Sequence, residues 1–180
     1  MALKSTIYKA ELQLVDMDRH VYGDHALTLA RHPSETVERM MVRVLAYALH
    51  AQEGIAFTRG LSEVDEPDVW AKNLAGETTL WIDIGQPDEA RIRRACGRSD
   101  QVVVLCYAAS CDVWWKQIES KLTRFANLTV LQLPAGTAQA LGALAERGMR
   151  LQCLVQDGEI WMNTDAQSVP VKLVRLRSPA

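Results

Sequence analysis

The chain begins with two stretches in which apolar and polar side chains alternate. Residues 5–15 follow this period, and residues 23–30 follow it again after the polar segment 16–19. Side chains on a β-strand point alternately to its two faces, so a period of two predicts half-exposed strands joined by a turn. We therefore expect the fold to start with a hairpin that has one solvent-facing side.

The period changes to that of an amphipathic helix after His32-Pro33-Ser34-Glu35. Ser34 is the predicted N-cap, with an acidic residue in the first turn. The apolar positions then recur with the i, i+3, i+4, i+7 spacing of a helix that buries one face, and the helix is expected to end near Gly54. These positions are Val37, Met40, Met41, Val44, Leu45, Ala48 and Leu49.

Three later strands are apolar on both faces, which is typical of the covered centre of a parallel sheet. They lie at residues 79–84, 102–107 and 128–133. Predicted helices separate or follow these strands, at residues 87–97, 112–125 and 136–147.

Shorter strands complete the predicted sheet. One covers residues 54–59, two flank the hairpin turn Asp157-Gly158 within residues 151–163, and an edge strand covers 169–176. This pattern predicts one α/β domain over residues 1–180. Its architecture would be a single mixed β-sheet with parallel central strands, helices on both sides and antiparallel hairpins at the ends.

Charge and hydropathy narrow the classes of function. The chain carries 20 Lys and Arg against 22 Asp and Glu, so any contact with nucleic acid has to be a local basic patch. No segment approaches the roughly 20 apolar residues of a membrane span, and no apolar signal core begins the chain. The expectation is a cytoplasmic protein without membrane contact, and no required protein partner is evident.

The four cysteines and four histidines form no recognisable metal-binding motif. No Cys-x-x-Cys pair occurs among Cys96, Cys106, Cys111 and Cys153, and a cytosolic chain is expected to keep them as reduced core thiols. The histidines lack the His-Glu-x-x-His spacing of zinc proteases. Zinc chemistry is therefore unsupported.

Asp83 stands inside an almost unbroken apolar run, residues 80–84. An ionised carboxylate is unfavourable to bury without a partner, so its presence there indicates a use. Asp68 ends an acidic stretch before the preceding strand, and a turn can bring the two acids side by side. Mg²⁺, with Mn²⁺ as the alternative, takes carboxylate oxygens as ligands and can activate water against a phosphodiester. The other interpretation of Asp68 is a residue of a solvated loop.

Glu38 is a third candidate acid. It precedes Leu45 by two helical turns and projects within about 20° of the same direction, at the edge of the buried stripe, unlike Glu35. The alternative is a structural carboxylate that pairs with a nearby arginine.

The sequence also carries a resemblance to known families. Pro67-Asp68 followed by Asp83-Ile84-Gly85 resembles the PD-(D/E)XK nuclease pattern. Almost from end to end, the chain more closely resembles the YaeQ family of small bacterial proteins, which is similar in fold to those nucleases. The matching stretches are STIYKAELQ, TLARHPSETVERMM, FTRGL, DEPDVW, LWIDIGQPDEARIRRACGR and WWKQ with FANLTV.

The resemblance implies a mixed sheet flanked by helices and assigns roles to particular residues. Asp68 and Asp83 match the two metal-binding acids. Ile84 would offer its backbone carbonyl to the metal, and Glu38 matches the helical acid of several nuclease branches.

The sequence departs from the nuclease pattern at the lysine, because Gly85 stands in its place. Gln86, one residue further on, would orient a water molecule. Arg91, Arg94 and Arg98 share one face of the predicted helix and would hold phosphate, although solvated helix charges are the alternative. Arginine keeps its proton too firmly to serve as a general base.

Two functions follow. The first is a Mg²⁺-dependent phosphodiesterase, a nuclease, that acts on nucleic acid. The second is a non-catalytic binding or regulatory protein, for nucleic acid or protein, that keeps the nuclease-like fold; the missing lysine favours it. Trp114 and Trp115 would stack bases in either case, or else divide between core and surface packing.

Overall fold

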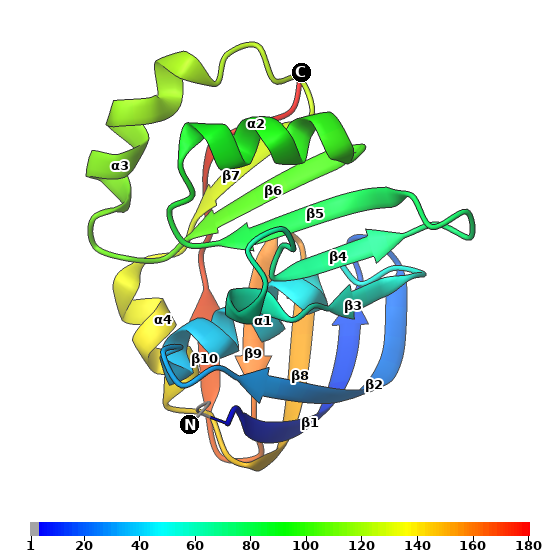
Figure 1. Ribbon diagram of the computed structural model, residues 1–180. Helices are drawn as coiled ribbons and strands as arrows, with labels where there is room; N and C mark the ends of the chain where they lie inside the picture. Colours follow the sequence, from blue (N-terminus) through cyan, green and yellow to red (C-terminus); the bar gives the residue numbers. More distant parts are fainter. Residues whose placement is uncertain (1–3) are drawn as a thin grey trace. The chain divides into compact units, whose positions relative to one another are not determined.

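The computed structural model describes residues 4–180, which divide into two compact units. The first unit takes the chain up to Ala51 together with Gly136–Lys172, and the second takes Gln52–Ala135 together with Leu173–Ala180. Each unit contains its own mixed β-sheet, so the prediction of a single sheet is wrong (Figure 1). The mixed α/β class is confirmed, and the single domain over residues 1–180 stays a prediction.

The first unit is built on a five-stranded sheet in the order β10-β9-β8-β1-β2. Its strands are β1 (Thr6–Asp16), β2 (Val21–Arg31), β8 (Gly148–Gln156), β9 (Glu159–Asn163) and β10 (Ser168–Val171). The predicted β1–β2 hairpin is confirmed and is paired along its whole length. β8 runs parallel to β1. Asp157 and Gly158 both have positive φ and form the predicted tight turn between β8 and β9.

Helix α1 (Val37–Leu49) follows β2 and buries most of its residues. Its N-cap is Thr36, whose hydroxyl accepts the Arg39 N–H at 3.1 Å. The prediction of Ser34 as N-cap is wrong, because the Ser34 hydroxyl lies 2.6 Å from His32 Nδ1 and closes a turn before the helix. The helix therefore begins two residues later than the sequence pattern indicates.

Glu35, which precedes the helix, turns inward and is buried beside two arginines of α1. Its Oε1 accepts from Arg39 at 3.0 Å and from Arg43 Nε at 2.8 Å, and its Oε2 accepts from Arg43 Nη2 at 2.8 Å. The expectation that Glu35 lies outside the buried face is therefore wrong. This ion-pair cluster joins the end of β2 to α1, because Arg43 also donates to the Ala30 carbonyl.

The second unit is built on a six-stranded sheet in the order β11-β7-β6-β5-β4-β3. Its strands are β3 (Ile55–Phe57), β4 (Val69–Lys72), β5 (Thr78–Ile84), β6 (Gln101–Cys106), β7 (Leu128–Gln132) and β11 (Val174–Arg177). The three doubly apolar strands β5, β6 and β7 are parallel neighbours, as predicted. β4 and β11 pair antiparallel at either side of this parallel group.

Two helices of the second unit, α2 (Glu89–Arg98) and α3 (Cys111–Ile118), pack against β5, β6 and β7. Trp81, Ile92, Val104 and Trp114 belong to the core between them. Asp88 caps α2 by accepting the Arg91 N–H at 2.8 Å. The cap fixes the first turn of α2 directly after the end of β5, where the candidate acids lie.

Several predicted elements differ from the observed ones. Helix α1, expected to end near Gly54, ends at Leu49. The helix expected over 112–125 ends at Ile118, and a 3-10 turn at Glu119–Lys121 follows it. Helix α4 (Ala135–Gly142) ends earlier than 147, and β8 starts at Gly148. The edge strand expected over 169–176 is two strands, β10 and β11, in different sheets. No helix within residues 4–180 is long and apolar enough to cross a membrane.

The prediction of four reduced thiols is wrong for one pair, because Cys106 and Cys111 form a disulfide. β6 ends at Cys106 and α3 begins at Cys111, which brings their Cα atoms to 6.0 Å, a distance that a disulfide spans. Cys96 and Cys153 are free thiols. Burial raises the pKa of Cys96 to about 11 and that of Cys153 to about 12, so both thiols stay protonated at neutral pH.

Candidate functional site

The structure brings Asp68 and Asp83 together, and both are buried, at 4% and 3% exposure. Asp83 is near the end of β5, and Asp68 immediately precedes β4, the antiparallel neighbour of β5. The Asp68 N–H donates to the Ile82 carbonyl at 2.9 Å, and its Oδ2 accepts the Ile84 N–H at 2.8 Å. Asp68 is thus bonded to β5 on both sides of Asp83. The interpretation of Asp68 as a solvated loop residue is wrong.

Arg91 of α2 binds both oxygens of Asp83. Its Nε lies 2.8 Å from Oδ2 and its Nη2 lies 2.9 Å from Oδ1, a bidentate ion pair. The same guanidinium donates to the carbonyls of Val64 at 2.6 Å and Glu66 at 2.8 Å. Arg91 therefore joins three elements: the first turn of α2, the end of β5 and the loop before β4.

Burial raises the pKa of Asp83, and the nearby Asp68 raises it further, whereas Arg91 lowers it. Asp83 in turn raises the pKa of Arg91. Two buried carboxylates thus lie beside Arg91 at the end of β5. Buried acids grouped in this way are typical of functional sites, and carboxylate oxygens are the ligands of hard cations.

Trp81, two residues before Asp83 on β5, adds a polar group beside the acids. Its indole N–H is buried and has no hydrogen-bond partner among the described residues. It is near enough to Asp83 to lower the pKa of that carboxyl. The ring lies 5.9 Å from the Arg91 guanidinium. A ligand or solvent oxygen beside Asp83 would supply the acceptor that this N–H lacks.

The loop before β4 is itself held by charge. Arg59 donates to Glu66 Oε1 at 2.8 Å, and this contact lowers the pKa of Glu66. Arg59 is largely exposed, so the pair contributes little to stability. Its consequence is local: it keeps the loop carbonyls where Arg91 binds them.

Gly85 and Gln86 follow the acids at the end of β5. Gly85 has a φ of 112°, a conformation that side chains of the L configuration rarely adopt, although a Cβ there would meet no atom within 4 Å. The backbone, rather than lack of space, therefore explains why no lysine stands at this position. Gln86 is exposed, and its Nε2 donates to Ser110 Oγ at 2.7 Å.

The three predicted phosphate-binding arginines lie in two different environments. Arg94 and Arg98 are exposed on α2, whereas Arg91 is directed inward to Asp83. The basic face available to a phosphate in this state is therefore Arg94 and Arg98 alone. Trp114 is a core residue, and its Nε1 donates to the Pro87 carbonyl at 3.0 Å, so it packs rather than stacks on a ligand.

Glu38 lies on α1 in the first unit, whereas Asp68 and Asp83 belong to the second. It is half-buried and packs against Gly142 of α4, where an added Cβ would come within 2.8 Å of Glu38 Cγ. Its role as a third acid of the site stays a prediction. Within residues 4–180, no three His, Cys, Asp or Glu side chains are grouped as a metal site.

The donor types at the acid pair fit Mg²⁺, which is usually held by one or two carboxylates and several waters. Asp68, Asp83 and the Ile84 carbonyl are the groups that would hold it. In extended backbone the N–H and C=O of one residue point to the same side, so the Ile84 carbonyl shares the side on which Asp68 lies. Arg91 occupies both Asp83 oxygens, so a cation there has to displace the guanidinium.

Sequence reasoning missed two features. The first is Arg91 as the partner of Asp83, for which the signal is an arginine in the first turn of the helix that follows an acid-bearing strand. The second is a row of side-chain amides, Gln13, Gln152 and Asn163, on the outer face of the five-stranded sheet. The corresponding signal in the sequence is an amide at an outward-facing position of each alternating strand. One strand taken alone does not distinguish such an amide from an ordinary surface residue.

The fold is that of a mixed α/β protein with two mixed sheets and, within residues 4–180, four α-helices. Its candidate site is a pair of buried acids beside Arg91. A family model described as YaeQ protein matches residues 1–173. The chain belongs to the YaeQ family.

Relatives and solved structures agree with this assignment. The chain is 45% identical over 181 residues to the uncharacterized protein YaeQ of Escherichia coli (strain K12), with 100% of each chain covered. The crystal structure of YaeQ protein from Xanthomonas axonopodis pv. citri is similar with a TM-score of 0.94 at 48% identity, covering 97% of this chain and 99% of that one. The YaeQ structure from Pseudomonas syringae gives 0.93 at 37% identity, with 97% of each covered.

Proposed function

We propose that this protein has a PD-(D/E)XK nuclease-like fold and is a divalent-cation-dependent phosphodiesterase that acts on nucleic acid. The observation that carries the proposal is the pair of buried carboxylates, Asp68 and Asp83, which the hydrogen bonds of Asp68 to β5 hold side by side. Buried acids grouped in this way cluster at functional sites. Mg²⁺, or Mn²⁺ in its place, is the cation whose ligand preference matches the donors present.

When bound, the cation supplies a Lewis acid for a phosphate oxygen and a water of lowered pKa. Asp68, Asp83 and the Ile84 carbonyl would hold it. The Trp81 N–H, buried without a partner, would donate to an oxygen beside Asp83. Gln86 would orient the attacking water, in place of its present contact with Ser110.

Arg91 would have two roles in this scheme. Without the cation it neutralises Asp83, and once displaced it would join Arg94 and Arg98 on α2 as a phosphate-binding group. Its positive charge suits a phosphodiester oxygen, and guanidinium geometry favours bidentate contacts with phosphate. Arg91 keeps its proton too firmly to take one from water, so its role would be to bind the substrate phosphate rather than to act as a general base.

A second candidate is a non-catalytic binding or regulatory protein that keeps the nuclease-like fold. Two observations favour it: the backbone of Gly85, which excludes the usual lysine, and the Arg91–Asp83 pair, which occupies a principal metal ligand. In that case Arg91 would be a permanent structural replacement for the cation, and Arg94 with Arg98 would bind phosphate without cleavage.

Incubation with single-stranded, duplex and branched DNA and RNA in Mg²⁺ or Mn²⁺ separates the two candidates. The phosphodiesterase predicts cleavage that Asp83→Asn abolishes and that the control Asp100→Asn, at an exposed acid of the same unit, leaves unchanged. Binding without cleavage in either metal would identify the second candidate. Neither binding nor cleavage on any of the substrates would contradict the phosphodiesterase and also the nucleic-acid-binding form of the second candidate.

A further inference from the structure

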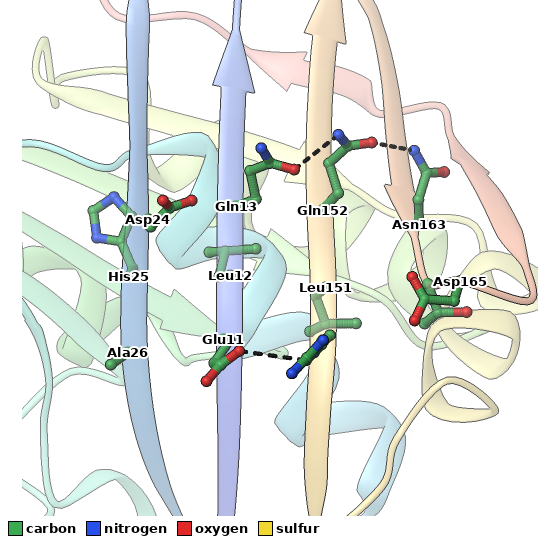
Figure 2. Close-up of a pocket in the computed structure, with 12 residues that line it drawn as sticks. Glu11, Leu12, Gln13, Asp24, His25, Ala26, Leu151, Gln152, Asn163 and Asp165 are labelled. Carbon is green, nitrogen blue, oxygen red and sulfur yellow. Dashed lines mark hydrogen bonds and ion pairs between the residues drawn. The ribbon is translucent and has the colours of Figure 1, made fainter.

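The outer face of the five-stranded sheet carries a hollow of about 650 Å³ in the first unit (Figure 2). Four strands, β2, β1, β8 and β9, and the start of the turn after β9 contribute its walls. A second hollow of about 430 Å³ adjoins it, since Arg150, Thr164 and Asp165 line both. We refer to the two adjoining hollows together as the amide groove. It belongs to a different unit from Asp68 and Asp83, and the inference below does not depend on the proposed function.

A row of hydrogen-bonded amides crosses the floor of the amide groove. Gln152 donates to Gln13 Oε1 at 3.1 Å, and Asn163 donates to Gln152 Oε1 at 3.1 Å (Figure 2). Ser168 on β10 donates to Asn163 Oδ1 and extends the row. Every bond points the same way across the sheet. The row therefore links side chains from four strands into one hydrogen-bonded array.

Each amide in this row keeps hydrogen-bonding capacity for a ligand. A side-chain amide has two N–H donors and an oxygen with two lone pairs. Gln152 uses one N–H and one lone pair within the row. It therefore presents both a donor and an acceptor to the groove. A matching ligand has to accept hydrogen bonds as well as donate them.

The charges that line the amide groove are predominantly negative. Its acids are Glu11, Asp24, Glu146 and Asp165, and its basic side chains are Arg150 and His25. Arg150 lies 3.5 Å from Glu11, an exposed pair that offsets one acid. Asp24, on β2, lies next to Gln13 at one end of the amide row, and Asp165, after β9, lies near Asn163 at the other end (Figure 2). The groove therefore attracts cationic groups at both ends.

We infer that the amide groove binds an extended, lysine- or arginine-rich peptide segment of a partner protein. Such a segment carries backbone C=O and N–H groups for the amide row and cationic side chains for Asp24 and Asp165. A polyamine would only donate hydrogen bonds, a neutral sugar would leave the carboxylates without a counter-charge, and a nucleic acid would be repelled by them. The four strands span about 14 Å, which corresponds to roughly four residues of extended chain.

Fluorescence anisotropy with labelled peptides of about eight residues tests the inference, since that length exceeds the span of the row. The expected result is saturable binding of a Lys/Arg-rich peptide that weakens as salt is added, because the contacts are exposed to solvent. A glutamate-rich peptide and a glutamine-rich peptide of the same length should not bind. Equal binding of spermidine, measured by competition, or of the glutamine-rich peptide would overturn the assignment to a basic peptide.

Substitutions in the amide groove provide a second test of the inference. Asp24→Asn and Asp165→Asn should each lower the affinity for the basic peptide by about twofold to fivefold, as expected for exposed ion pairs. Gln152→Leu breaks the row at its middle and should weaken binding by up to about tenfold, the upper value for one neutral hydrogen bond. Glu53→Gln, at an exposed acid outside the groove, is the matched control and should change nothing. Thermal melting confirms that each variant is folded, and unchanged affinity in folded Gln152→Leu would contradict the role of the row.

Discussion

The two units each bury carboxylates beside arginines, and the two groups differ in the number of acids that they bring together. In the first unit one acid, Glu35, binds two arginines of α1. In the second unit two acids, Asp68 and Asp83, lie side by side at the end of β5, and Arg91 binds both oxygens of Asp83. The first group is a set of ion pairs with a structural explanation. The second group places two carboxylates, the ligands of a hard cation, together, and this difference is what makes it the candidate site.

Glu35→Ala should have the largest effect of the substitutions that test this comparison. It leaves Arg43, with a side chain only 3% exposed, without its acid, and breaking a buried ion pair costs roughly 3–5 kcal/mol. Glu89→Ala, which removes an exposed partner of Arg93, is the control and should cost at most about 1 kcal/mol. Urea unfolding measures both. A similar loss in the two variants would mean that the Glu35 cluster is not a structural element.

Arg91→Met should destabilise the second unit by about 2–3 kcal/mol, less than the Glu35 change because Arg91 is 24% exposed. The loss comes from the unpaired charge on Asp83 and the freed loop carbonyls of Val64 and Glu66. Arg94→Met, at an exposed position of the same helix, should stay within about 0.5 kcal/mol. If the two variants unfold alike, the Arg91 contacts do not hold the site together.

The raised pKa of Asp83 predicts how the stability of the folded protein depends on pH. The folded protein holds the Asp83 proton more firmly than the unfolded chain, where the pKa is about 3.9. This stabilisation is present in full below the unfolded pKa and is lost as pH rises through the higher folded pKa. Asp83→Asn removes it, so the stability of wild type relative to the variant should rise as pH is lowered through that window. A relative stability that falls with acidification would show that Arg91 lowers the pKa by more than burial raises it.

The smallest expected effect concerns Glu38. Gly142→Ala places a Cβ 2.8 Å from Glu38 Cγ and 3.3 Å from its Cα, and such overpacking should outweigh the helix preference of alanine by about 1 kcal/mol. In a Glu38→Ala background the Cγ contact is absent, so the same substitution should be nearly neutral. A double-mutant cycle measures this coupling. Additive effects would show that Glu38 does not pack on α4.

Local patterns predicted much of this fold correctly. The β1–β2 hairpin follows from strict alternation, and the parallel group β5, β6 and β7 follows from strands apolar on both faces. The turn at Asp157-Gly158 follows from residues that tolerate positive φ. These features depend on neighbouring residues alone, which is why a single sequence contains them.

Long-range features were missed for a physical reason. The division into two sheets depends on the break after Val171, where the chain leaves β10 and starts β11 at Val174 in the other sheet, and local hydropathy does not encode it. The pairing of Cys106 with Cys111 depends on where β6 ends and α3 begins. The apolar residues around Asp83 predicted that this acid has a specific role. Its arginine partner could not be predicted, because the pairing depends on the direction in which the first turn of α2 leaves β5.

The central claim is that the acid pair is a cation site which Arg91 occupies in the absence of metal. Calorimetric titration with Mg²⁺ and Mn²⁺ tests this claim most directly. The account predicts that Arg91→Met binds the cation at least about tenfold more tightly than wild type, a gain of roughly 1.4 kcal/mol from the lost competition. Asp83→Asn, alone or combined with Arg91→Met, should abolish binding. Equal affinity of wild type and Arg91→Met, or binding that survives Asp83→Asn, would contradict the account.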